Sequence, residues 1–207
     1  RLLEGSVVNT PKMGERTAVK QALTEADTRV QETILSALYE EFPTVALAAE
    51  EETPGVERFP EQGESLVIID PIDGTLHSYL EERGPYAVIV GLALAGEMKS
   101  ALVALPREDV LFRGSFGVGA ETLGSGEVPE RASASADGDV IFVSHNVPDS
   151  IRQALKAEGL EVVPACGGAV AVAPLIQGVR AGLRLADRSN ATGISIRGRV
   201  GLVIARE

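Results

Sequence analysis

The chain has 207 residues, 44% of them hydrophobic but only 4% aromatic, so aliphatic side chains must fill the core of one compact unit or two joined lobes. Its net charge of −11 argues against a nucleic-acid or anionic-membrane partner, because phosphate groups are bound mainly by Lys and Arg. The single cysteine, Cys166, excludes an intrachain disulfide and an all-cysteine zinc site, and we interpret it as a small core or loop residue.

No feature of the sequence is typical of a membrane or secreted protein. No apolar run reaches about 18 residues, and no signal-peptide pattern opens the chain. Whether a short leader precedes Arg1 stays an open alternative. The expected compartment is the cytoplasm.

The first predicted element is an amphipathic helix over residues 24–42. Apolar residues recur there at spacings of three and four, from Val30 to Phe42. Thr24-Glu25-Ala26-Asp27 has the form of a capping box at the helix start, and Pro43 ends the helix.

Aliphatic runs predict strands through the middle of the chain. A short apolar piece over residues 45–49 leads into three glutamates, and residues 65–69 form a buried strand that ends at Asp70. Residues 86–95 and 99–105 form a hairpin, which residues 110–113 extend. Residues 114–138, rich in Gly, Ser and Ala, are predicted to be loops between two lobes.

From residue 139 onward the pattern alternates between strands and helices. Strands are predicted over 139–144, 160–164 and 182–186, helices over 149–158 and 169–179, and a final helix or strand over the last ten residues. Such alternation favours parallel strand pairs in a layered α/β lobe. The predicted fold class is α/β, with an α+β metal-binding first lobe over residues 1–135 and a smaller α/β lobe over residues 136–207.

The segment most suggestive of chemistry is Asp70-Pro71-Ile72-Asp73-Gly74-Thr75. Two carboxylates lie three residues apart at the end of a buried strand, where Pro and Gly are expected to turn the chain and bring the Ile72 carbonyl beside them. Mg²⁺ prefers such hard oxygen ligands. The alternative is a structural turn whose Asp side chains cap backbone amides.

Two acidic residues upstream have similar alternatives. Glu50 follows a short apolar run, so it is either a further oxygen ligand or part of a solvated face made by Glu50, Glu51 and Glu52. Asp27 is either a site residue or only the reciprocal half of the capping box.

These residues together resemble the inositol-monophosphatase-like family. The segment 70–75 matches its Asp-Pro-[Ile/Leu]-Asp-Gly-Thr signature, which the fructose-bisphosphatase and phosphoadenosine-phosphate phosphatase branches share. Thr24–Asp27, Phe42-Pro43, Glu50-Glu51 and the turn Gly117-Val118-Gly119-Ala120 follow in the family's order. The resemblance implies a layered αβαβα sandwich of the sugar-phosphatase type, here short at the C-terminal end.

The resemblance also implies residue roles. Mg²⁺ would be held by Glu50, Asp70, the Ile72 carbonyl and Asp73. Asp27 and Thr75 would orient and deprotonate the attacking water, with Glu50 also counted among the catalytic residues, and the Gly74 and Thr75 amides would bind the phosphate. The implied activity is Mg²⁺-dependent hydrolysis of a small polyol, sugar or nucleotide phosphate by metal-activated water, and a homodimer is expected.

Arg197 departs from the family pattern, because counting back from the chain end places it where the family has a metal-binding Asp. It either grips the substrate phosphate, or Asp187 takes the vacant role, or the protein is an impaired member that binds a phosphate ligand or partner without turnover. Arg16 stands where the family often has Lys.

The two histidines, His77 and His145, are interpreted as structural or exposed. Ser144-His145 and Gly167-Gly168-Ala169 resemble pieces of the phosphoadenosine-phosphate branch, but they do not identify the substrate.

Overall fold

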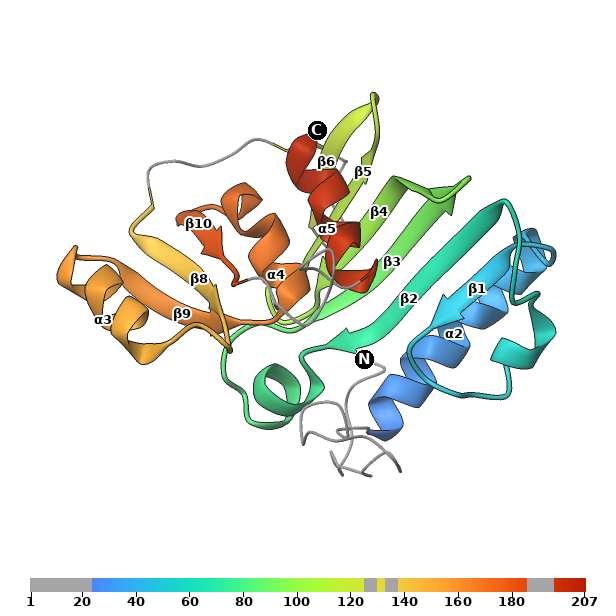
Figure 1. The fold of residues 1–207 in the computed structure, drawn as a ribbon, viewed down its shortest axis with the longest axis horizontal. Helices are drawn as coiled ribbons and strands as arrows, with labels where there is room; N and C mark the ends of the chain where they lie inside the picture. The colour runs from blue at the N-terminus through green and yellow to red at the C-terminus, as the bar shows by residue number, and fades with distance from the viewer. Residues whose placement is uncertain (1–23, 125–129, 133–137, 186–195) are drawn as a thin grey trace.

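The computed structural model describes residues 24–124, 130–132, 138–185 and 196–207, and of residues 196–198 it describes the backbone only. Five layers follow one another: helix α2, a seven-stranded sheet, helices α4 and α5, a three-stranded sheet and helix α3 (Figure 1). This is the layered αβαβα arrangement that the sequence predicts.

The seven-stranded sheet is mixed, with order β1-β2-β3-β4-β5-β6-β7. Strand β1 pairs with β2 in parallel, and every later pair is antiparallel. The strands are β1 (Ala46–Ala49), β2 (Ser65–Asp73), β3 (Ala87–Leu94), β4 (Glu97–Leu105), β5 (Val110–Ser115), β6 (Gly119–Gly124) and β7 (Glu130–Arg131). A 3₁₀ turn, η1 (Val56–Arg58), lies in the connection from β1 to β2.

The prediction that residues 114–138 are loops was wrong for β6 and β7. Strand β6 pairs along its whole length with β5, from Ser115 opposite Gly119 to Val110 opposite Gly124. The neighbouring strand supplies backbone hydrogen bonds to a segment whose small residues give no apolar alternation. The amino-acid composition therefore did not predict β6, which forms because it pairs with β5.

Strand β2 also continues further than predicted. The sequence suggested an end at Asp70 and a turn after it, but the strand runs to Asp73, with a register irregularity between Asp70 and Asp73. Pro71 lies within this irregularity, which is where a residue without an N–H is tolerated in a sheet.

Helix α2 (Glu25–Glu41) covers the outer face of the sheet beside β2. Its predicted capping box is confirmed, since the Thr24 side chain accepts from the Asp27 N–H and the Asp27 side chain accepts from the Thr24 N–H. Leu35 packs with Val67 and Ile69 of β2 in a buried cluster.

The three-stranded sheet has order β10-β8-β9, and both of its pairs are parallel, as predicted. Its strands are β8 (Val140–Ser144), β9 (Glu161–Ala165) and β10 (Val179–Leu183). Helix α3 (Asp149–Ala157) packs on one face and α4 (Gly167–Val172) on the other. The predicted strand 182–186 begins earlier, at Val179, after the 3₁₀ turn η3 (Ala173–Leu175) that shortens the predicted helix.

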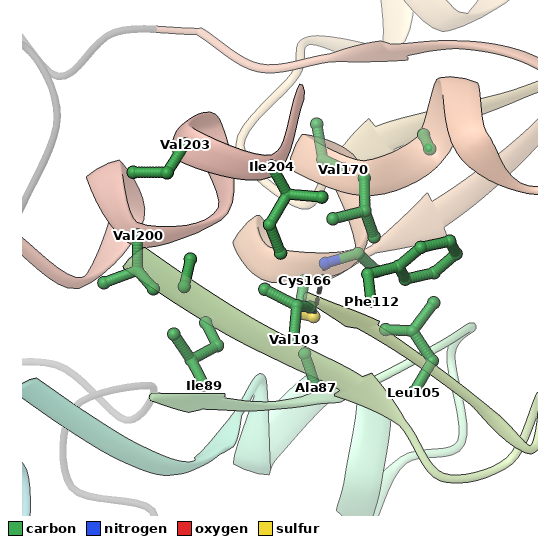
Figure 2. Packing of buried hydrophobic residues seen from close by; sticks show 14 of the residues in the cluster. Ala87, Ile89, Val103, Leu105, Phe112, Cys166, Val170, Val200, Val203 and Ile204 are labelled. Atoms are coloured by element: carbon green, nitrogen blue, oxygen red, sulfur yellow. Dashed lines mark hydrogen bonds between the residues drawn. The ribbon is translucent and has the colours of Figure 1, made fainter. Parts of the chain in front are cut away.

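Helices α4 and α5 (Ile196–Arg206) fill the space between the two sheets. Val200, Val203 and Ile204 of α5 face Ile89 and Val103 of the large sheet, with Val170 of α4 beside them (Figure 2). Helices α4 and α5 belong to the second predicted lobe but pack on the sheet of the first. The lobe boundary at residue 135 therefore stays a prediction. Within the described part of the chain, no helix is both long and apolar enough to span a membrane.

Candidate active site

The candidate site lies where the carboxyl end of β2 meets the carboxyl ends of the three parallel strands. Three hydrogen bonds join these regions: the Gly168 N–H donates to Asp73 Oδ2 at 2.5 Å, the Cys166 N–H donates to the Pro85 carbonyl at 3.3 Å, and Ser78 Oγ lies 3.1 Å from His145 Nε2. Ligand sites of open α/β sheets form at such strand ends.

Asp27, Thr75 and the Ile72 carbonyl form one hydrogen-bonded chain. Thr75 Oγ1 lies 3.0 Å from Asp27 Oδ1 and 2.8 Å from the Ile72 carbonyl oxygen. Since the hydroxyl has a single proton, it serves only one of these two acceptors well at a time. A hydroxyl in this position can pass a proton toward Asp27.

The Asp27 carboxylate is held firmly on its other side. Its Oδ2 accepts from the Thr24 N–H at 2.8 Å and from Thr24 Oγ1 at 2.5 Å, and the residue is 1% exposed. Burial raises the pKa of Asp27 above its ordinary value, the Thr24 hydrogen bonds oppose this, and the Glu50 charge adds to the rise. The capping role and a site role are therefore combined in one side chain.

Asp73 is fixed from the opposite side of the site. Its carboxylate accepts from the Gly168 N–H and from the Cys166 thiol, and Arg184 acts on it electrostatically. Burial raises the pKa of Asp73, and the Glu50 charge adds to the rise. Cys166 is buried, as interpreted, but it also caps α4 and contacts Asp73. Its place two residues after the predicted strand 160–164 was the one sequence signal for this contact.

The three-glutamate run is divided by its surroundings. Glu51 is buried, Glu50 is partly buried and Glu52 is exposed, so the run is not a uniform solvated face. Gln31 of α2 holds this segment, since its Oε1 accepts from the Glu51 N–H at 3.1 Å and its Nε2 donates to the Glu51 carbonyl at 2.6 Å. The helix thereby fixes the segment that carries Glu50, and the Glu50 charge raises the pKa of both Asp27 and Asp73.

Gly74 connects β2 to a π-helical turn, η2 (Thr75–Leu80). Its φ of 95° lies in the left-handed region, and a Cβ at this position would come 2.7 Å from the Cys166 Cβ. Arg107 clamps the turn, because its Nη1 donates to the Ser78 carbonyl at 2.9 Å and its Nη2 to the Tyr79 carbonyl at 3.2 Å. The backbone that carries Thr75 is therefore held in one conformation by Gly74 and Arg107.

The rings of the two histidines are in contact, with centroids 4.7 Å apart and planes tilted by 39°. His77 Nδ1 lies 2.9 Å from Glu81 Oε2, and His145 bonds to the buried Ser78. Burial lowers the pKa of His145 to about 4, and the neighbouring His77 adds to the effect. These contacts link η2 to the end of β8.

Some sequence-predicted positions lie outside what the structure describes. Asp187 and Arg16 belong to segments outside the described residues, and Arg197 is described only as backbone in the first turn of α5. The three accounts of Arg197 therefore stay predictions.

The residues expected to hold Mg²⁺ fit it in their chemistry. Glu50, Asp70, Asp73 and the Ile72 carbonyl are all hard oxygen donors, and the Glu50 charge raises the pKa of Asp73. Among the described residues, however, no three His, Cys, Asp or Glu side chains are gathered closely enough to hold a metal ion. The Asp73 carboxylate is instead turned toward Gly168.

A layered αβαβα fold, in which Asp73 joins the strand ends of the two sheets through Gly168, is typical of sugar-phosphatase-type proteins. The sequence model of the inositol monophosphatase family matches residues 6–181, and the chain belongs to that family. Inositol monophosphatase 2 of Mus musculus is 28% identical over 120 residues, which cover 58% of this chain and 41% of that protein. The match thus spans about two fifths of the curated relative.

Solved structures share the fold. The Thermotoga maritima IMPase superposes with a TM-score of 0.68 at 24% identity, covering 99% of this chain and 76% of that one. An IMPase/NADP phosphatase crystallised with Mg²⁺ and phosphate superposes with a TM-score of 0.57 at 19% identity, covering 89% and 66%. At these identities the likeness concerns the fold.

Proposed function

We propose that the protein is a Mg²⁺-dependent phosphomonoesterase that hydrolyses a small polyol, sugar or nucleotide phosphate. The observation that carries this proposal is the chain from Asp27 through Thr75 to the Ile72 carbonyl. Family membership supports a phosphatase, and the related structure that contains Mg²⁺ and phosphate supports the choice of metal.

The contacts of the residues support the following roles. Asp27 accepts a proton through Thr75, whose hydroxyl orients the water that attacks phosphorus. A carboxylate with a raised pKa is the stronger base, so burial of Asp27 suits it to this task. Gly74 sets the backbone of the turn that presents Thr75 to the phosphate.

Glu50, Asp70, the Ile72 carbonyl and Asp73 would hold Mg²⁺, which when bound supplies charge stabilisation to the phosphate and its leaving oxygen. Asp73 can serve as a ligand through Oδ1 while its Oδ2 keeps the hydrogen bond from the Gly168 N–H. The contact with Cys166 and Gly168 thus limits the orientations that Asp73 can take.

The test is phosphate release from inositol 1-phosphate, glucose 1-phosphate and adenosine 3′,5′-bisphosphate, with Mg²⁺ and with EDTA. We expect release that requires Mg²⁺ and is lost in Asp70→Asn. The matched control is Asp149→Asn, which makes the same change at an exposed position in the first turn of α3.

Release equal in wild type and Asp70→Asn would overturn the proposal for these esters. If phosphate esters then bound without turnover, the protein would be the impaired family member that Arg197 suggests.

A further inference from the structure

A cation stands at the carboxyl end of β10, on the side of the site opposite Asp27. Arg184 directly follows β10, and its side chain is exposed. The neighbouring Leu183 and Leu185 belong to the cluster under α3, so alternation along the chain directs Arg184 to the α4 side of the sheet. The residue therefore lies where the strand ends of the small sheet face Asp73.

The position of the guanidinium is marked by two observations. Its Nη1 would lie only 2.8 Å from a Cβ added to Gly167, and the same Cβ would lie 3.5 Å from Asp73 Oδ2. The Arg184 charge also lowers the pKa of Asp73, against the larger effect of burial. Arg184 and Asp73 therefore flank the same small space over Gly167.

Arg184 does not neutralise Asp73 by direct contact. The Asp73 carboxylate takes its hydrogen bonds from Gly168 and Cys166, and Arg184 forms no ion pair or hydrogen bond with any residue of the described ranges. An Arg whose only role was charge compensation would be expected to close on the carboxylate. Its side chain is exposed beside the site.

The location also separates Arg184 from the reacting phosphate. The Arg184 guanidinium lies beside Gly167, which follows β9 of the small sheet, whereas Asp27 is bonded to Thr75 at the end of β2. The proposed attack takes place at the Asp27–Thr75 pair, on the β2 side of the site. A group bound by Arg184 is thus a different part of the substrate from the phosphate being hydrolysed.

We propose that Arg184 is a specificity-determining residue that binds a second anionic group of the substrate, so that the preferred substrate is a phosphate monoester carrying a further phosphate or carboxylate. This proposal rests on the proposed phosphatase function. A guanidinium forms two parallel hydrogen bonds with either kind of group, which a single neutral hydroxyl does not offer. In a chain with a net charge of −11, such a substrate needs a cation of this kind.

The experiment compares two matched pairs of esters in wild type and Arg184→Gln. Glucose 1,6-bisphosphate differs from glucose 1-phosphate by a second phosphate, and 2-phosphoglycerate differs from glycerol 2-phosphate by a carboxylate. We expect Arg184→Gln to raise KM about tenfold or more for the doubly anionic member of at least one pair, with kcat changed less than about threefold. The singly anionic partner should be unaffected, and the pair that responds identifies the second group.

Two further variants separate a specific contact from net charge. Arg184→Lys keeps the charge without the planar fork and should restore part of the affinity. Arg206→Gln makes the same charge change at the exposed end of α5 and should behave like wild type. Equal changes for both members of each pair, or no change for any, would overturn the inference.

A binding measurement distinguishes failure of this inference from failure of the proposed function. If wild type releases phosphate from none of the four esters, the phosphatase proposal fails, and calorimetric titration of the same esters into both proteins tests Arg184 alone. Weaker binding of only the doubly anionic esters by Arg184→Gln supports its role. Identical binding by the two proteins refutes it.

Discussion

The two sides of the candidate site hold their carboxylates in different ways. Asp27, on the large-sheet side, is bonded to Thr24 three residues away and to Thr75, which lies on the same side of the site. Asp73 points to the small-sheet side and is bonded to Gly168, 95 residues later in the chain. Asp27 is buried and Asp73 partly buried, and burial raises the pKa of both.

This difference separates what is set locally from what depends on docking. The Asp27–Thr75 pair requires only that α2 and β2 pack together, which an aliphatic cluster of Leu35, Val67 and Ile69 ensures. The orientation of Asp73 requires the two sheets to be held at one spacing. The large-sheet side should therefore tolerate loosening of the sheet-to-sheet contacts, while the small-sheet side should not.

The largest expected effect is on turnover in Asp27→Asn. Because Asp27 is the base that accepts a proton through Thr75, its loss should lower kcat by about 10² to 10⁴-fold with little change in KM. Steady-state kinetics with the best ester of the panel measure this. Glu25→Gln, an equal charge change at an exposed position of the same helix turn, should leave kcat within about twofold. Unchanged kcat in Asp27→Asn would exclude Asp27 as the base.

The contact between the two sides at Gly74 and Cys166 is tested by Gly74→Ala. An alanine at this position would have to adopt the left-handed φ of 95°, and its Cβ would lie 2.7 Å from the Cys166 Cβ. We therefore expect the free energy of unfolding to fall by about 2 kcal/mol or more. Gly96→Ala is the control, because its φ of 82° is similar but a Cβ there meets nothing within 4 Å. It should lose about 1 kcal/mol. Urea unfolding measures the stability of both variants. Equal losses of unfolding free energy would show that the Cys166 contact is unimportant.

The support of Glu50 on the large-sheet side is tested by Gln31→Leu. The buried Gln31 amide satisfies the Glu51 backbone and Thr53, so its loss should cost about 1 to 3 kcal/mol and also lower kcat through Glu50. Gln153→Leu makes the same change at an exposed site of α3 and should be close to neutral. Urea denaturation and kinetics measure both properties. A loss of stability without any loss of kcat would separate Gln31 from the site.

The smallest effect concerns pH and the small-sheet side. The pKa of His145 is about 4 in the folded protein, against an ordinary value of 6.5, because of burial and of His77. Below pH 6.5 the unfolded chain binds this proton more readily, so stability is lost as pH falls toward 4. The other charged groups that act on His145 are Arg152, Arg83 and Glu81.

We therefore expect His145→Gln to flatten the fall in the free energy of unfolding between pH 7 and pH 5. Urea unfolding at the two pH values measures it, and phosphatase kinetics serve as the check that the large-sheet side is unaffected. An unchanged pH dependence would show that other groups control acid stability.

Local signals in the sequence determined the family and much of the fold. The capping box of α2, the aliphatic strands β3 and β4, and the parallel α/β alternation after residue 139 all depend on neighbours within a few residues, and the structure confirms them. The segment 70–75 likewise made the family recognisable, and the match over residues 6–181 confirms it.

Tertiary structure decided the rest, because it depends on which distant segments meet. Strand β6 exists through pairing with β5, and β2 continues past Asp70 because β3 pairs with Asp73. The contacts of Asp73 with Gly168 and Cys166, and its exposure to the Arg184 charge, arise only when two sheets bring their strand ends together across nearly a hundred residues. No periodicity or short motif encodes that separation, since it is set by the packing of α4 and α5 between the sheets.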